Sequence, residues 1–178
     1  ATMVLSSIFF VGDFKMMIYP LTIGASCLIT SIIGTFFVKL GNNKNVMNAL
    51  YKGFIVSAVA SLAILWPVTD YVIGFTNEYT IDNKTFNGKD LYYCGVIGLV
   101  ITGLLIWITE YYTGTSYRPV KSVALSSTTG HGTNVIQGLA VSMEATAIPA
   151  LIIVSGILLT NFIAGLFGIA IAVTTMLA

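Results

Sequence analysis

Residues 126–159 have the sequence SSTTGHGTNVIQGLAVSMEATAIPALIIVSGILL, a polar loop with two glycines that passes into a long apolar run. An α-helix needs about 20 consecutive apolar residues to cross the hydrocarbon core of a bilayer. Glu144 lies near the middle of this run. A carboxylate at that depth is costly to bury, which makes it a candidate for function. The stretch therefore predicts a membrane helix that carries one ionisable side chain.

The composition extends this prediction to the whole chain. Hydrophobic residues make up 56% of the 178 residues and charged residues only 8%, whereas a soluble domain has about 25% charged residues. The runs are continuously apolar and do not alternate, so we predict an all-α, polytopic transmembrane helix bundle and not a barrel. The net charge of +1 gives no sign of nucleic-acid binding. Cys27 and Cys94 fall in apolar runs and are interpreted as packing residues, not as a disulfide or a metal pair.

The apolar runs also predict where the spans lie. They predict complete spans at 17–38, 54–75, 91–112 and 133–159 and truncated spans at 1–11 and 161–178. Truncated spans at both ends lead us to expect that residues 1–178 are a fragment of a single larger membrane domain. The span at 133–159 is longer than a bilayer requires, so we expect it to tilt or to project from the membrane.

Basic residues predict the orientation. The first-to-second and third-to-fourth connections contain or adjoin five of them, Lys39, Lys44, Lys52, Arg118 and Lys121, and the opposite face has three, Lys15, Lys84 and Lys89. Loops rich in Lys and Arg tend to stay in the cytoplasm. The first set of loops is therefore predicted to be cytoplasmic.

A polar stripe runs along the predicted fourth span. Gln137 and Glu144 are seven residues apart and almost superimpose on a helical wheel, and Thr133 lies about 40° from Gln137. We interpret the stripe as a possible ion-coupling feature that extends from the cytoplasmic end of the helix towards mid-membrane. Pro149 cannot donate to the carbonyl of Ala145, so the backbone there is expected to be loosened. The alternative is a static role, in which Glu144 is protonated or hydrogen-bonded and holds two helices together.

The connection before this span carries Arg118, Lys121 and His131 beside two glycines. Glycine loops before a helix expose backbone N–H groups, so this cytoplasmic loop is a candidate for approaching a phosphate. It lacks the GxxxxGK[ST] pattern of a P-loop. His131 has no second ligand at metal spacing. We therefore predict no catalytic residue and no metal ligand within the chain.

Residues 110–149, EYYTGTSYRPVKSVALSSTTGHGTNVIQGLAVSMEATAIP, resemble the membrane-bound, ion-pumping inorganic pyrophosphatases. The first residues, ATMVLSSIFF, resemble the outer end of that family's sixth helix. The last, AGLFGIAIAVTTMLA, resemble the start of its eleventh. The resemblance implies a homodimer in a lipid bilayer, expected to be the bacterial inner (plasma) membrane. It also implies hydrolysis of pyrophosphate with Mg²⁺ at the cytoplasmic side and outward movement of H⁺ or Na⁺. Glu144 and the GHGTN stretch favour H⁺.

The family's acidic magnesium–pyrophosphate motifs do not occur in these residues, so no catalytic or magnesium-binding residue is carried over. The expected function is a fragment of a pyrophosphate-energised proton pump. Two other classes stay open, a segment of a secondary transporter or channel and a non-transporting structural membrane subunit. A secondary transporter predicts an inverted repeat, which the sequence does not display.

Overall fold

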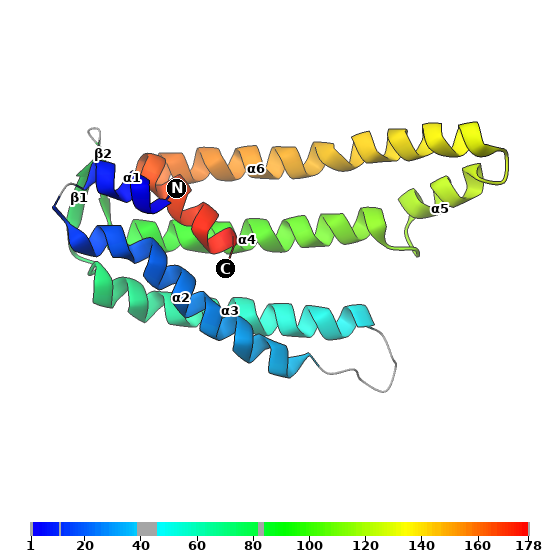
Figure 1. Cartoon of the computed structure of the whole chain (residues 1–178). Helices are drawn as coiled ribbons and strands as arrows, with labels where there is room; N and C mark the ends of the chain where they lie inside the picture. Colours follow the sequence, from blue (N-terminus) through cyan, green and yellow to red (C-terminus); the bar gives the residue numbers. More distant parts are fainter. Residues whose placement is uncertain (1, 11, 39–45, 82–83, 178) are drawn as a thin grey trace. The chain divides into compact units, whose positions relative to one another are not determined.

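The computed structural model describes residues 2–10, 12–38, 46–81 and 84–177. Along these residues the elements are α1 (Thr2–Phe9), α2 (Phe14–Phe37), α3 (Val46–Val72), β1 (Glu78–Ile81), β2 (Lys84–Asn87), α4 (Gly88–Thr113), α5 (Arg118–Ser126) and α6 (His131–Met176) (Figure 1). In the described part of the chain, four helical stretches are long and apolar enough to cross a membrane. The predicted all-α, polytopic bundle is confirmed.

The helices overlap the ranges expected from hydropathy. The two spans expected on either side of residue 160 both fall within α6, which has a kink close to their boundary. Its backbone leaves helical geometry at Ala164 and at Gly165, where φ is 63° and ψ is −153°. A left-handed φ favours glycine, so the chain changes direction where glycine permits it. Lys39 and Lys44, which contributed to the predicted orientation, lie outside the described residues.

A short antiparallel hairpin, β1–β2, lies between α3 and α4 and was not predicted. Its register pairs Tyr79 with Phe86 and Thr80 with Thr85. The strands are four residues each, which is too short for hydropathy to detect. The alternation of polar and apolar residues from Glu78 to Ile81 is the one signal in the sequence that could have indicated a strand.

The chain divides into two compact units, residues 1–99 with 159–178 and residues 100–158. In the first unit, α1 packs on α2 and α2 packs along α3 (Figure 1). The largest side chains of its core are fully buried and come from α2, α3, the hairpin, α4 and the end of α6; they are Met16, Tyr19, Ile23, Leu65, Phe86, Leu91, Phe167 and Ile171. Cys27 and Cys94 are buried in this unit as free thiols, as the sequence predicted.

The interface of α2 and α3 combines small residues with paired hydroxyls. A Cβ atom added to Gly34 would lie 2.8 Å from the Cβ of Ser57, so the two backbones approach closely. Further along, the Thr30 and Ser61 hydroxyls lie 2.7 Å apart and are buried. Thr30 donates its proton to the Cys27 carbonyl at 2.8 Å, which leaves Ser61 to donate to Thr30. Close approach and interhelical hydrogen bonds are the means by which membrane helices associate.

Replacing Thr30 with valine should keep the shape of the side chain and leave the Ser61 hydroxyl without its acceptor on α2. Interhelical hydrogen bonds of this kind contribute about 0.6 kcal/mol on average in membrane proteins. We expect a small loss of thermal stability of the full-length protein in detergent. Thr35→Val is the matched control, because the exposed Thr35 hydroxyl donates within its own helix, to Ile32. Equal unfolding temperatures for the two variants would show that the hydroxyl pair does not stabilise this interface.

Small residues also line the contact of α4 with the end of α6. Ala164 and Ala172 are buried, and a Cβ atom added to Gly168 would lie 3.0 Å from the Cys94 sulfur. The Thr175 hydroxyl, also buried, donates to the Gly95 carbonyl of α4 at 3.1 Å. This stripe of small residues therefore brings two helix backbones together without a large side chain between them.

The second unit consists of the later part of α4, α5 and the earlier part of α6. A Cβ atom added to Gly156 of α6 would overlap the side chain of Ile101 on α4, so these two helices also pack closely. Pro119 is buried at the start of α5, where a missing N–H does little harm to a helix. The apolar and polar residues of α5 are segregated onto different faces. Within this unit, the beginning of α6 therefore lies beside α5 and the end of α4.

Candidate functional site

The predicted polar stripe begins at the connection of α5 and α6. The Thr133 hydroxyl lies 2.8 Å from the Thr129 hydroxyl. It is also within 3.0 Å of the Ser126 carbonyl and 2.8 Å of the Gly130 carbonyl. Gly130 has a φ of 145°, a conformation that glycine adopts without a steric penalty. The Thr133 hydroxyl thus stabilises the turn that leads into α6.

One turn further along α6, the stripe contacts α5. The Gln137 amide nitrogen lies 3.3 Å from the Ser122 hydroxyl. Asn134, on the same part of α6, has a buried side-chain oxygen for which the described residues provide no hydrogen-bond donor. A buried acceptor without a donor is uncommon in proteins. The junction of α5 and α6 is therefore polar but incompletely paired.

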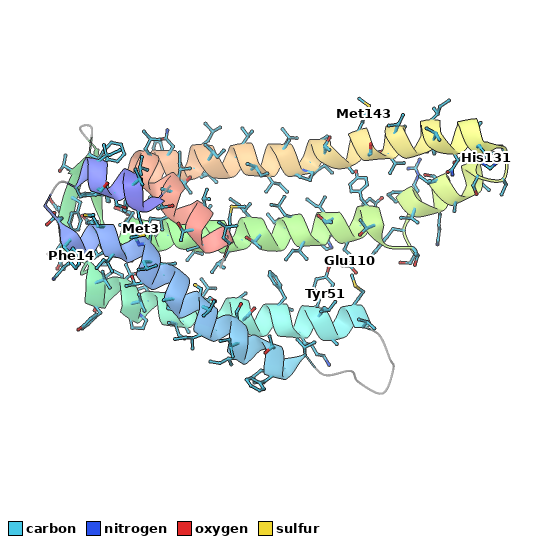
Figure 2. The ribbon with its side chains drawn as sticks, in the orientation of Figure 1. Met3, Phe14, Tyr51, Glu110, His131 and Met143 are labelled. Atoms are coloured by element: carbon cyan, nitrogen blue, oxygen red, sulfur yellow. The ribbon has the colours of Figure 1, made fainter. Side chains whose placement is uncertain are left out.

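Glu144 contacts the end of α4. Its carboxylate lies next to the Tyr112 hydroxyl and interacts with it electrostatically. The Tyr112 ring meets Tyr111 edge-on at 5.2 Å, and Tyr111 in turn lies 5.4 Å from the Tyr117 ring before α5. Met143, the preceding residue, points away from α4 and is exposed (Figure 2). Glu144 is itself exposed, so Tyr112 is the neighbour on α4 that its carboxylate meets.

The three predicted stripe residues share one side of α6 but do not meet one another. Gln137 and Glu144 are two turns apart, about 10 Å along the axis. Thr133 contacts the loop, Gln137 contacts α5 and Glu144 contacts α4. The stripe is a row of separate contacts between α6 and its neighbours. The contact of Glu144 with Tyr112 links α6 to α4.

Pro149 does not interrupt α6. The helix α6 continues through Pro149, and within it only Ala164 and Gly165 have non-helical φ and ψ. A proline within a membrane helix removes one hydrogen bond, and neighbouring groups can compensate for the loss. The irregular backbone of α6 thus lies some twenty residues beyond Glu144.

The candidate loop residues are exposed and lie at separate positions. Arg118 begins α5, Lys121 follows one turn later and His131 begins α6, as Figure 2 shows for His131. Within the ranges that the structure describes, no three His, Cys, Asp or Glu side chains gather in a way that would hold a metal ion. The loop therefore presents two cationic side chains, Arg118 and Lys121, and one imidazole at separate positions.

Tyr112 and Ser122 are the partners that the sequence did not predict. Tyr112 stands beside Tyr111 in the sequence, with no local sign of a partner in α6. It lies 32 residues before Glu144 in the chain, and no local period connects the two. The pairing depends on how α4 packs against α6, which hydropathy does not encode.

Comparisons with known proteins bear on the whole chain. The family described as Inorganic H+ pyrophosphatase matches residues 1–178. The chain is 57% identical over 178 residues to the "Pyrophosphate-energized proton pump 2" of Mycoplana dimorpha, covering 98% of this chain and 86% of that protein. It is 54% identical over 135 residues to the "Pyrophosphate-energized proton pump" of Anaplasma marginale, covering 76% of this chain and 96% of the relative.

In a longer relative, the residues that match this chain make up about a quarter of the protein. The "K(+)-insensitive pyrophosphate-energized proton pump" of Methanosarcina mazei is 41% identical over 187 residues, which cover 100% of this chain and 26% of that protein. Together with the apolar helices, the relatives indicate an integral, multi-pass membrane protein. With a family match that extends from the first residue to the last, the chain belongs to the inorganic H⁺ pyrophosphatases.

Proposed function

We propose that this chain is part of a pyrophosphate-energised proton pump that couples hydrolysis of pyrophosphate in the cytoplasm to export of H⁺. The observation that carries the proposal is the family match over residues 1–178, together with relatives whose names specify this activity. The apolar helices supply the membrane-spanning scaffold that a pump requires. We place the protein in a bacterial plasma membrane and expect it to act as a homodimer, as the family resemblance implies.

Magnesium belongs to this proposal only for the larger protein. Bound Mg²⁺ would neutralise the negative charge of the diphosphate and favour attack by water. The described residues do not fit such a site, because they bring no group of three carboxylate, His or Cys side chains together. The ligands would come from parts of the longer protein outside residues 1–178. The residues of this chain would support the helices that carry those ligands.

The function is tested with the full-length protein in proteoliposomes. Addition of magnesium pyrophosphate should release phosphate and acidify the lumen, as read by a pH-sensitive dye. A protonophore should abolish the acidification, whereas a sodium ionophore should not. Phosphate release without acidification, or acidification that depends on Na⁺, would contradict the proposed H⁺ pump. Transport without any pyrophosphate hydrolysis would favour a secondary transporter instead.

Within this pump we propose that Glu144 modulates coupling through its contact with Tyr112. Glu144→Gln keeps the size of the side chain and removes its charge. We expect pyrophosphate hydrolysis to stay within about twofold of wild type while protons pumped per pyrophosphate change by about twofold or more, the range in which residues away from a reaction centre alter coupling. Both rates should be measured on the same proteoliposomes.

Two further variants make this experiment decisive. Tyr112→Phe removes only the hydroxyl that contacts Glu144 and should move the coupling ratio in the same direction. Glu78→Gln removes the charge of an exposed carboxylate in β1 and should leave the ratio at the wild-type value. Glu144→Gln could instead yield less folded protein, with the folded fraction pumping the wild-type number of protons per pyrophosphate. That result would show that Glu144 only holds two helices together.

A further inference from the structure

The hairpin β1–β2 is fastened to the helices on either side of it. The Asn77 amide, just before β1, donates to the Ile73 carbonyl at the end of α3 at 2.6 Å. The Tyr79 hydroxyl donates to the same carbonyl at 3.3 Å. On the other side, the Asn87 N–H donates to the Asp90 carboxylate in the first turn of α4 at 2.9 Å. The two strands of the hairpin are thus hydrogen-bonded to the chain at the end of α3 and the start of α4.

One face of the hairpin carries two aromatic rings that pack into the first unit. Tyr79 and Phe86 are paired across the strands, and their rings stack at 6.3 Å. The Phe86 ring lies 6.4 Å from that of Phe10 and 6.3 Å from that of Phe167. The rings of Phe10 and Phe167 meet edge-on at 5.2 Å. We call Phe10, Tyr79, Phe86 and Phe167 the aromatic cluster.

The aromatic cluster is closely packed at its centre. Phe86 is 1% exposed and Phe167 is fully buried, with 0% exposed. Aromatic pairs in offset or edge-to-face geometry stabilise a contact beyond the area that they bury. The ring of Phe86 therefore joins the hairpin to two further chain segments at a single point.

The two segments joined there are the end of α1 and the part of α6 that follows its kink. Phe10 directly follows the last residue of α1, and Phe167 lies two residues after Gly165. At the other end of the same pair, the Thr2 and Thr174 hydroxyls lie 3.2 Å apart. Contacts of residue 10 with 167 and of residue 2 with 174 mean that the two segments run side by side in opposite directions.

The two ends of α1 are held very differently. Its last turn leads into the buried aromatic cluster, whereas its first turn contacts the post-kink segment through the Thr2 and Thr174 hydroxyls beside a groove of about 600 Å³. Residues from both segments and from α2 line this groove, among them Met3, Leu21, Gly24 and Leu177. The post-kink segment is packed against α4 at Thr175, so α1 is the helix that can swing about the aromatic cluster.

We propose that Phe86 is a positioning residue for pumping, which pins the end of α1 and the start of the post-kink segment of α6 to the hairpin and makes that point a pivot. Movement of α1 about this point is then not lost as a shift of the whole pair. The proposal rests on the proposed function, because it concerns the coupling of hydrolysis to transport. It assigns a role to the connection between α3 and α4.

The test uses the full-length protein in proteoliposomes and measures phosphate release and proton uptake together. Phe86→Ala should leave hydrolysis within about twofold of wild type and lower the protons moved per pyrophosphate by about threefold or more, as expected for a residue that acts on coupling. Phe86→Leu keeps most of the volume, so it should fold even where the alanine variant does not, and should show a smaller decrease of the same ratio. Thr85→Ala, an exposed neighbour in β2, should match the wild type.

Hydrogen exchange provides a second readout. Phe86→Ala, or Phe86→Leu if the alanine variant does not fold, should speed amide exchange in residues 2–9 and 166–176 relative to Thr85→Ala. A wild-type coupling ratio in both Phe86 variants would overturn the pivot and leave the proposed function intact. Hydrolysis and transport that fall in equal proportion would also overturn it, because that pattern indicates a purely structural role. A wild-type protein that neither hydrolyses pyrophosphate nor pumps would instead overturn the proposed function.

Discussion

Replacing Gly98 with alanine should separate α4 from the end of α6 and cost about 2 kcal/mol of stability or more, the range found for overpacked interiors. A Cβ atom at Gly98 would overlap the Thr175 hydroxyl and the Ala172 carbonyl oxygen. That carbonyl oxygen is part of a helix backbone and cannot rotate away. The helices would have to move apart, which would also strain the hydrogen bond from Thr175 to Gly95.

Gly103→Ala is the matched control for this change. Gly103 lies in the same helix, and a Cβ atom there would meet nothing within 4 Å. Alanine favours a helix over glycine by about 1 kcal/mol in exposed positions of soluble helices, so Gly103→Ala should be neutral or slightly stabilising. The measurement is the thermal unfolding midpoint of the purified full-length protein in detergent. Equal midpoints for the two variants would contradict the close approach of α4 and α6 at Gly98.

Replacing Gly165 with alanine should have the second large effect, through the backbone. Gly165 has a φ of 63° and a ψ of −153°, a region that is essentially restricted to glycine and costs other residues on the order of 1–3 kcal/mol. If the backbone relaxed to helical angles instead, the segment after Gly165 would point in another direction. Phe167 and Ile171, both fully buried, would then lose their contacts.

The control for this variant is Gly24→Ala in α2. Gly24 lies within a helix, and a Cβ atom there would have no neighbour within 4 Å. Gly165→Ala should lower the unfolding midpoint and speed amide exchange in residues 166–176, while Gly24→Ala should change neither. Wild-type protection of residues 166–176 in Gly165→Ala would show that the kink does not depend on glycine.

The long helices were predictable because their signal is local and repeated. A run of apolar residues crosses lipid only as a helix, since every backbone N–H and C=O must be paired inside the segment. The α5 helix and the β1–β2 hairpin were missed because they are short and mixed in polarity. Their form depends on contacts with α6 and with the ends of α3 and α4.

The candidate site was likewise predicted only in part from the sequence. The helical period places Thr133, Gln137 and Glu144 on one side of α6. In the structure these residues contact the loop, α5 and α4, respectively. The period did not show that each meets a different partner. The expected boundary between two spans near residue 160 does not place the kink, which lies at Ala164 and Gly165, because glycine tolerates a left-handed φ whereas an apolar run carries no signal for one.

Hydropathy and local period were sufficient for the membrane class, the helices and the face of α6 that carries the polar stripe. Packing decided which residues meet across helices, namely Tyr112 with Glu144, Ser61 with Thr30 and Phe86 with Phe167. The reason is physical. In a bilayer, each helix forms from its own hydrogen bonds, whereas helix association depends on shape and on a few polar contacts between residues far apart in the chain. Only the folded arrangement brings those residues together.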